Sequence, residues 1–264
     1  MIQFKYNKHI VKKQLGQNFL IDSHIIDNII NSISPKKKDI MIEIGPGLGA
    51  LTFGLCRLLH KLFVIEYDKD LVTRLHASSC GIKNLKIFSK DVLTFDFSCI
   101  ENNFYNSIRI FGNLPYNISV TLLFYLFRYN NIFDMHFMFQ KEVANRLLAL
   151  PGTKYYSRLS IMSQYFCKIT RLFDVFPQSF RPVPKVCSTF LRLVPYKQKR
   201  YCIKNMINFK KVITLAFSKR RKTIRNSLSE LFSEDILKNL SIDPMLRAEN
   251  ISIMQYCILS NYIS

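Results

Sequence analysis

Residues 43–52 read EIGPGLGALT and directly follow the apolar run Ile40-Met41-Ile42. Three glycines at alternating positions let the backbone turn tightly and approach a ligand that a Cβ would exclude. Because a helical pattern follows, the stretch predicts a strand, a glycine loop and a helix, as in nucleotide-type cofactor sites at the carboxyl edge of a parallel sheet. It is not a phosphate-binding loop, since no Gly-Lys-Ser/Thr follows. The glycines alone do not identify the ligand.

Short apolar segments alternate with helical segments around this loop. We expect a first helix that begins after Asp22 or Ser23 and ends near Pro35. The expected strands then cover residues 40–44, 62–66, 85–89, 108–112 and 135–140, and the expected helices cover 50–59, 69–77, 118–128 and 141–149. This alternation predicts right-handed βαβ units and an α/β fold with a mostly parallel sheet.

The pattern changes after residue 151. A helix-like run over 158–167 precedes two β-like runs, 169–176 and 187–194, which suit an antiparallel hairpin at one edge of the sheet. Beyond Pro195 the chain has helical patterns over 205–217, 219–232 and 252–262. We therefore expect two domains, residues 1–196 with the sheet and residues 197–264 as a small all-helical domain.

The composition indicates a basic protein of the cell interior. The chain has 38 Lys and Arg against 18 Asp and Glu, a net charge of +20, which favours a polyanionic partner, above all nucleic acid. Its seven cysteines form no Cys-x-x-Cys pair and its five histidines form no cluster, so we expect reduced thiols and no metal site. The sequence has no signal-peptide pattern and no membrane-span run, so we expect a soluble, cytoplasmic protein.

Two acidic residues follow expected strands at positions that suit an adenosine-containing cofactor. Glu66 ends the strand 62–66, 17 residues after Gly49, where a carboxylate can accept hydrogen bonds from both ribose hydroxyls. Asp91 follows the strand 85–89, where a carboxylate can accept from the exocyclic amine of adenine. The alternatives are a strand-end Glu or helix cap for Glu66 and an ordinary loop residue for Asp91.

The strand 108–112 runs into Asn113-Leu114-Pro115-Tyr116, which indicates chemistry on the amino group of a base. Adenine N6 is a poor nucleophile because its lone pair is delocalised into the ring. The Asn113 side-chain oxygen and the neighbouring main-chain carbonyl, at Leu114, can accept from its N–H hydrogens and stabilise the positive charge that grows during attack. Pro115 fixes the turn, and Tyr116 offers a face on which the extruded base can stack.

These residues closely resemble the motifs of the KsgA-type ribosomal RNA adenine N6-dimethyltransferases, which use S-adenosylmethionine. The resemblance covers nearly the whole chain. The similar segments are Gln17-Asn18-Phe19-Leu20, residues 43–52, Val64-Ile65-Glu66, Asp91-Val92, Asn113-Leu114-Pro115-Tyr116, residues 139–147, 180–186 and 220–228, Ile242-Asp243-Pro244 and Arg247-Ala248-Glu249. One such motif would be weak evidence, but this many in order are strong evidence.

The resemblance implies a Rossmann-like methyltransferase sheet with an antiparallel edge strand and a helical C-terminal domain. It also implies dimethylation of N6 on two adjacent adenosines in a hairpin loop near the 3′ end of small-subunit (16S) rRNA, within an assembling 30S-type subunit. It assigns cofactor contacts to Asn18, Leu20, Gly45, Glu66, Asp91 and Asn113. We expect catalysis to depend on Asn113, Leu114 and Tyr116, and the protein to act as a monomer without a metal ion.

Basic residues define the expected RNA-binding surface. Five of them lie within seven residues of the expected helix 219–232, and two more lie near the mouth of the cofactor site: Lys219, Arg220, Arg221, Lys222, Arg225, Lys12 and Lys13. Cations at this density usually contact phosphates, because without a partner they repel one another. Phe180 is a further candidate, either stacking on the target base opposite Tyr116 or packing beneath the hairpin.

Other functions stay open at this point. A large-subunit rRNA dimethyltransferase of the antibiotic-resistance type shares the pocket motifs, although the similarity at residues 220–228 and 247–249 favours the small subunit. A non-catalytic ribosome-assembly factor would keep the fold, but the intact Asn113–Tyr116 segment speaks against binding alone. A dinucleotide dehydrogenase would explain only the glycines and Glu66.

Overall fold

The structure is a computed structural model that describes residues 5–7, 9–100, 107–198 and 200–264, without the side chain of Lys13. The chain forms two compact units. Unit 1 comprises Met1–Ala144 and Ile169–Pro195, and unit 2 comprises Asn145–Lys168 and Tyr196–Ser264. The chain therefore leaves unit 1 beside the expected boundary at residue 196. Unit 2 also takes in residues 145–168, which the sequence pattern had placed in the first domain.

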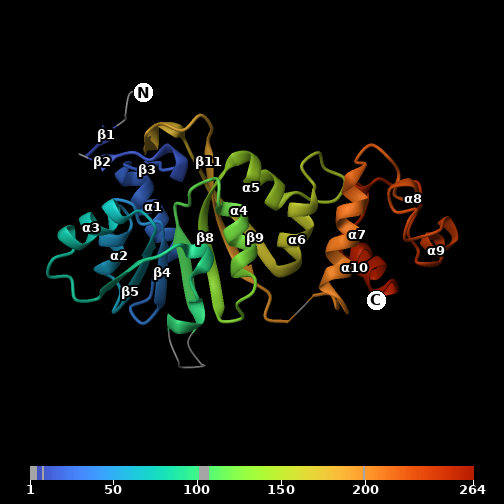
Figure 1. Ribbon diagram of the computed structural model, residues 1–264, viewed down its shortest axis with the longest axis horizontal. Coiled ribbons are helices and arrows are strands. Elements are labelled where there is room, and N and C mark those ends of the chain that lie inside the picture. The colour runs from blue at the N-terminus through green and yellow to red at the C-terminus, as the bar shows by residue number, and fades with distance from the viewer. Residues whose placement is uncertain (1–4, 8, 101–106, 199) are drawn as a thin grey trace. The chain divides into compact units, whose positions relative to one another are not determined.

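A seven-stranded mixed sheet forms the centre of unit 1 (Figure 1). The strand order is β6 (Leu85–Ser89), β5 (Leu62–Glu66), β4 (Ile40–Ile44), β7 (Ile108–Gly112), β8 (Ile132–Gln140), β11 (Ser188–Pro195) and β9 (Cys167–Val175). The five strands from β6 to β8 are parallel to their neighbours, and β11 is antiparallel to β8. The expected α/β fold with a mostly parallel sheet and an antiparallel edge is confirmed.

The central strands are continuous apolar runs because both faces of the sheet are covered. Every residue of β4, β5 and β7 is buried, as parallel strands between two layers require. Helices α1 (Ser23–Ile33) and α2 (Thr52–Cys56) pack on the face that contains Met41, Val64 and Phe111. Unit 1 also contains α3 (Lys69–Ser78) and α4 (Ser119–Leu126), and α5 (Lys141–Leu148) begins in it.

Arg109, in the otherwise apolar strand β7, donates hydrogen bonds to carbonyl groups at the C-terminal end of α1. Its guanidinium donates to the carbonyls of Ile33 and Ser34, at 2.7 and 3.2 Å, and pairs with Asp39 and Asp134, at 2.7 and 2.8 Å. The last carbonyls of a helix have no hydrogen-bond partner within the helix, and the guanidinium supplies donors to them. The two carboxylates balance its buried positive charge. This network ties α1 to the amino ends of the strands.

The chain before α1 is an arm with little regular structure. It contains the two-residue strands β1 (Lys5–Tyr6) and β2 (His9–Ile10), the turn η1 (Lys13–Leu15) and β3 (Phe19–Leu20). β3 pairs with β10 (Phe180–Arg181), which lies between the edge strand β9 and its neighbour β11 in the chain. Asp22 caps α1, as expected, and also accepts from the hydroxyl of Ser179 at 2.9 Å.

Unit 2 is helical, with α6 (Arg158–Phe166), α7 (Met206–Ser218), α8 (Ile224–Ser227), α9 (Glu234–Asn239) and α10 (Ile253–Tyr262). Residues 145–168 belong to it because their aromatic rings pack against α7: Tyr156 lies against Phe217 and Tyr165 against Phe209. Among the described residues, no helix is long and apolar enough to cross a membrane.

The expected helix 219–232 is wrong. Residues 219–223 form a turn, in which the Lys222 N–H donates to the Lys219 carbonyl at 2.8 Å, and only four residues beyond it form α8. Thr223 instead pairs with Arg247 in a single antiparallel bridge, and the Ile224 N–H donates to the Leu246 carbonyl at 2.7 Å. Four successive cations disfavour a helix, and pairing with the 244–247 segment supplies the backbone hydrogen bonds instead.

Candidate active site

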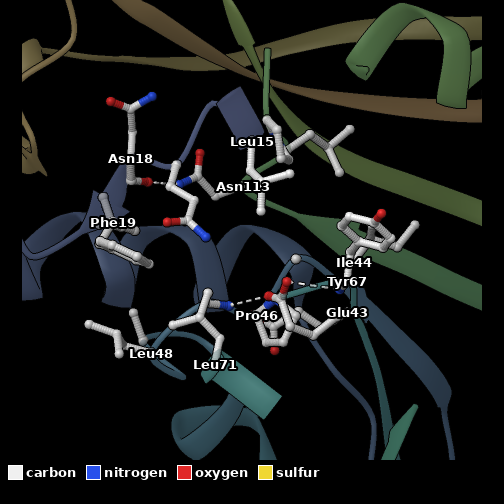
Figure 2. Close-up of a pocket in the computed structure, with 18 of the residues that line it drawn as sticks. Leu15, Asn18, Phe19, Glu43, Ile44, Pro46, Leu48, Tyr67, Leu71 and Asn113 are labelled. Atoms are coloured by element: carbon white, nitrogen blue, oxygen red, sulfur yellow. Dashed lines mark hydrogen bonds between the residues drawn. The ribbon is translucent and has the colours of Figure 1, made fainter. Parts of the chain in front are cut away.

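A cavity of about 610 Å³ lies in unit 1, where β4, β5 and β7 end. Its size is typical of a site for a cofactor-sized ligand. The arm, the glycine loop and the segment after β7 contribute to its wall, as Figure 2 shows for Asn18, Phe19, Pro46 and Asn113. The cavity brings together all eight residues expected to bind cofactor or to catalyse: Asn18, Leu20, Gly45, Glu66, Asp91, Asn113, Leu114 and Tyr116.

The glycine loop has the backbone that its sequence predicts. Gly45, Gly47 and Gly49 have φ angles of +66°, +60° and +85°, which side chains rarely tolerate. A Cβ on Gly47 would lie 3.1 Å from the ring of Phe19, and one on Gly49 would lie 2.3 Å from the ring of Phe53. The loop is therefore a close-packed cradle of main chain that leaves no room for a Cβ at Gly47 or Gly49.

Glu66 is a nearly buried carboxylate whose orientation is determined by main-chain donors. Its oxygens accept hydrogen bonds from the N–H groups of Gly47, at 3.2 Å, and of Tyr67 and Asp68, both at 2.9 Å. Burial raises the pKa of Glu66, while these hydrogen bonds oppose that rise. The carboxyl group is thus held against the glycine loop, where it can act as an acceptor inside the cavity.

Glu43, at the end of β4, is a cavity residue that the sequence motifs did not single out. It is 2% exposed and accepts a 2.6 Å hydrogen bond from the hydroxyl of Thr52. Burial raises the pKa of Glu43 to about 8, and the nearby charge of Glu66 adds to the rise. The sequence did contain a signal, because Glu43 is the only acidic residue in an otherwise apolar strand.

The segment after β7 contributes its polar groups to the same cavity. The Asn113 Nδ2 donates to the main-chain carbonyl of Asn18 at 2.8 Å, and among the described residues its Oδ1 accepts no hydrogen bond. The hydroxyl of Tyr116 lies 2.5 Å from that of Ser188, so the ring has a fixed orientation. Burial raises the pKa of Tyr116. An amide oxygen and an aromatic face are therefore both available beside the cavity.

Asp91 lies at the cavity wall and also begins the short turn η2 (Val92–Thr94). One of its oxygens accepts from the Leu93 N–H at 2.9 Å. The second oxygen accepts no hydrogen bond from the described part of the chain, so the cap and the expected acceptor role are compatible.

The candidates for RNA contact near the cavity differ from expectation. Phe180 is completely buried in the core of unit 1 and does not line the cavity, so the structure supports packing and not stacking for this ring. Its burial follows from the β10–β3 pairing, which places it opposite Leu20. The ammonium of Lys12 pairs with Asp68 and Asp70, at 2.5 and 2.7 Å. The side chain of Lys13 lies outside the described part of the chain.

The basic residues of unit 2 divide into paired and unpaired cations. Arg220 pairs with Glu249 at 3.2 Å and donates to the Lys154 carbonyl, and Arg225 pairs with Glu234 at 3.3 Å. Lys219, Arg221 and Lys222 are exposed in the turn between α7 and α8, and none of the ion pairs found among the described residues includes them. Of the five basic residues expected to bind RNA in unit 2, these three remain available to an external anion.

A Rossmann-like sheet, a glycine loop and a strand-end carboxylate around one cavity are typical of enzymes that bind a nucleotide-type cofactor. A sequence model for ribosomal RNA adenine dimethylase matches residues 8–264, so the chain belongs to this family. The expected resemblance is confirmed. S-adenosylmethionine is accordingly the methyl donor.

Individual relatives agree with this family. The ribosomal RNA small subunit methyltransferase A of Buchnera aphidicola subsp. Baizongia pistaciae is 58% identical over 260 residues, which cover 98% of this chain and 99% of the relative. The protein of the same name from Erwinia tasmaniensis is 48% identical, over 97% of this chain and 94% of the relative.

Solved structures show the same architecture. A dimethyladenosine transferase from Plasmodium falciparum is 29% identical, with a TM-score of 0.78 over 91% of this chain and 95% of that protein. The 23S rRNA methyltransferase ErmE is 22% identical, with a TM-score of 0.71 over 93% of this chain and 99% of that protein, and shares the fold.

The residues present fit S-adenosylmethionine. The cavity volume suits a ligand of this size, the glycines leave main chain where a Cβ would obstruct, and Glu66 presents acceptor oxygens at the end of β5. Glu66 and Asp91 also place carboxyl groups at the cavity wall in an otherwise basic chain, which suits a cofactor that carries positive charge.

Proposed function

We propose that this protein dimethylates N6 of two adjacent adenosines in a hairpin loop near the 3′ end of small-subunit rRNA. The observation that carries the proposal is the state of Asn113 in this family member: its Nδ2 is engaged by Asn18, which leaves Oδ1 beside the cavity to accept from an amine. The relatives named small subunit methyltransferase A, at 48% to 58% identity, support the small subunit as the substrate.

The cofactor roles follow from the polar groups at the cavity wall. Glu66 accepts from the ribose hydroxyls, and the second oxygen of Asp91 accepts from the adenine amine. The backbone at Gly45, Asn18 and Leu20 encloses the amino-acid end. When bound, S-adenosylmethionine supplies a methyl group on a positively charged sulfur, which the adenine nitrogen can take directly.

The chain's own residues act on the acceptor amine. Asn113 Oδ1 and the Leu114 carbonyl accept from the N–H hydrogens, which favours a pyramidal nitrogen and stabilises its growing positive charge. The ring of Tyr116, held through Ser188, stacks on the extruded base. The amine proton leaves to solvent after transfer, so the step depends on positioning and needs no general base.

We infer that the exposed turn of unit 2 contributes phosphate contacts. Lys219, Arg221 and Lys222 carry the charge for this, while Arg220 and Arg225 are held by Glu249 and Glu234. We further propose that the protein acts in the cytoplasm as a monomer. Its partner is an assembling small subunit, because the net charge of +20 favours a large polyanion.

Transfer of labelled methyl groups to different RNA substrates tests the proposal. Naked small-subunit rRNA, immature small subunits, mature small subunits and large-subunit rRNA would each be incubated with the protein and labelled S-adenosylmethionine. We expect incorporation in immature small subunits, with two methyl groups on each of two adjacent adenosines. Incorporation only in large-subunit rRNA would instead assign the antibiotic-resistance reaction, and incorporation in none of the four would overturn the proposal.

A further inference from the structure

The arm that precedes α1 forms one wall of the cofactor cavity. Its residues 15–21 line the cavity, together with Tyr6 and Asn7. Leu20 packs in the main core of unit 1 and pairs with Phe180, whereas the segment before it has a small buried cluster of Val11, Phe19 and Leu71, with Tyr6 and Leu48 at the margin. Polar contacts add to these in holding the segment before β3.

Asp68 is the centre of these polar contacts. Its side chain is completely buried, and one oxygen accepts from the Lys12 ammonium at 2.5 Å and from the Asp70 N–H at 3.1 Å. The other oxygen accepts from Nε2 of Gln17 at 2.7 Å. Burial alone would raise the pKa of Asp68, but the hydrogen bonds from Lys12, Gln17 and Asp70 hold it below its usual range. The carboxylate is thus charged and saturated with donors.

Gln17 can meet Asp68 in one orientation only. Its Oε1 accepts from the Lys12 N–H at 2.8 Å and lies 3.2 Å from Nε2 of His9. A flipped amide would place its NH₂ group against the Lys12 N–H and its oxygen against the Asp68 carboxylate. The orientation of Gln17 therefore requires an acceptor oxygen at Asp68, which the carboxylate supplies.

The contacts of Asp68 connect the residue expected to bind the cofactor, Glu66, with the residue expected to bind the acceptor amine, Asn113. Its own N–H donates to Glu66 at 2.9 Å, on the cofactor side. Through Gln17 it holds the arm, and the next residue, Asn18, offers the carbonyl that accepts from Asn113 Nδ2 at 2.8 Å. Residues from three distant parts of the sequence are thereby connected in a chain of hydrogen bonds.

We propose that Asp68 is a positioning residue that couples cofactor binding to the orientation of Asn113, through the link Asp68–Gln17 and the adjoining link Asn18–Asn113. The inference rests on the proposed function for the role of Asn113. With the arm in place, the amide oxygen of Asn113 faces the cavity, and the wall of residues 15–21 closes the cofactor site. Without the Asp68 link, the arm loosens and both properties are lost together.

Asp70 provides a matched control. It also contacts Lys12, at 2.7 Å, but its side chain is 64% exposed and it has no side-chain link to Gln17 among the described residues. Asp68→Asn keeps the size of the side chain and a good helix cap, while it places an NH₂ group in the donor-filled site. Asp70→Asn removes the same amount of charge near Lys12.

The experiment measures cofactor binding and arm mobility as well as turnover. Calorimetry with S-adenosylhomocysteine would give Kd, hydrogen exchange would report on residues 9–20, and methyl transfer would give KM for the cofactor and kcat. For Asp68→Asn we expect Kd and KM to rise roughly 10- to 100-fold, as expected for a lost hydrogen bond to a charged group, and kcat to fall. Exchange in the arm should become fast and insensitive to the ligand. Asp70→Asn should stay within about threefold of wild type.

Two further variants keep the inference falsifiable if Asp68→Asn folds poorly. Gln17→Ala removes the link and leaves the cap of α3 intact, so it should reproduce the loss. Combining Asp68→Asn with Gln17→Glu restores a donor–acceptor pair and a negative charge, and should recover most of the affinity. Wild-type Kd and arm exchange in both Asp68→Asn and Gln17→Ala would overturn the inference, and so would an equal loss in Asp70→Asn. Because Kd and exchange need no RNA, these results are separate from any failure of the proposed substrate.

Discussion

The hydroxyl of Thr52, at the start of α2, donates a 2.6 Å hydrogen bond to the carboxyl of Glu43, at the end of β4. This pair lies beneath the glycine loop and is buried, with Thr52 at 0% and Glu43 at 2% exposure. A single neutral donor offsets only part of the cost of a buried carboxylate. Glu43 is therefore the group in the cavity wall whose ionisation the fold disfavours most clearly.

The raised pKa of Glu43 predicts a pH-dependent stability. Its folded pKa is about 8 against an ordinary value of 4.5, so the unfolded chain loses this proton first as pH rises. The contribution is fully present below pH 4.5 and is lost as pH rises through 8. Glu43→Gln should remove this loss and make the protein more stable than wild type at pH 9, by on the order of a few kcal/mol. Urea unfolding at pH 5, 7 and 9 measures it, with the exposed Glu230→Gln as control. If the free energy of unfolding had the same pH dependence in wild type and Glu43→Gln, the raised pKa of Glu43 would be contradicted.

Asn113→Ala should impair catalysis far more than cofactor binding. Removal of one acceptor for the growing charge typically costs about 10²- to 10³-fold in kcat, whereas the Kd for S-adenosylhomocysteine should change by less than about tenfold. Single-turnover methyl transfer and calorimetry separate the two effects. Asn131→Ala, at the other end of the sheet, serves as the control. Wild-type turnover in Asn113→Ala would exclude the role assigned to its oxygen.

Gly47→Ala should weaken cofactor binding beyond its effect on stability. The φ of +60° costs an alanine about 1–2 kcal/mol, and the added Cβ lies 3.1 Å from Phe19. Gly81→Ala is a suitable control, because Gly81 has a φ of +86° and no heavy atom within 4 Å of the added Cβ. Both variants should melt earlier, Gly47→Ala by more because of the Phe19 contact, and only Gly47→Ala should raise Kd for the cofactor. Equal Kd values in the two variants would refute the claim that the cofactor requires a glycine at position 47.

Phe180 offers a test of packing against base stacking. Phe180→Ala should cost about 3–5 kcal/mol of stability, since the ring is fully buried. Phe180→Leu should keep most of the stability and, if the ring only packs, also the activity. The exposed Phe176→Ala should be nearly neutral. Thermal melting and methyl transfer are the measurements, and loss of transfer in a stable Phe180→Leu protein would restore the stacking role.

The exposed turn of unit 2 predicts a specific salt dependence of RNA binding. Arg221→Ala combined with Lys222→Ala should weaken binding to small-subunit rRNA and lower the slope of log K against log salt by about one unit for each phosphate that the variant no longer neutralises. Lys210→Ala with Lys211→Ala removes equal charge from α7 and should change the slope less. Filter binding between 50 and 300 mM salt, roughly the range in which the effect is large, would measure both. An equal change of slope in the two double variants would contradict a specific role for the turn.

Much of unit 1 could be predicted because its strands are buried on both faces. The bounds of β4, β5 and β7 coincide with their apolar runs, and their carboxyl ends necessarily meet at one edge. The convergence of Gly45, Glu66 and Asn113 on one cavity follows from that geometry. Helix α2 is shorter than expected, because much of the glycine loop and the segment after Cys56 take non-helical turns.

The rest depends on contacts between distant residues that leave no periodic trace. The link between Gln17 and Asp68 joins residues 51 apart, so no local sequence pattern could indicate it. The pairing of Thr223 with Arg247 replaced an expected helix, and the pairing of Phe180 with Leu20 buried an expected RNA contact. In each case a tertiary partner decided between two locally acceptable conformations.

The pairing of β3 with β10 also bears on how the protein is made. Phe19 and Leu20 reach the cofactor cavity from the N-terminal arm, yet their strand partners are Arg181 and Phe180, about 160 residues later. A nascent chain that ends before Phe180 contains every residue that lines the cavity but lacks the strand that holds one wall in place. We therefore expect this wall of the cavity to reach its final position only late in translation, when almost the whole of unit 1 has been synthesised.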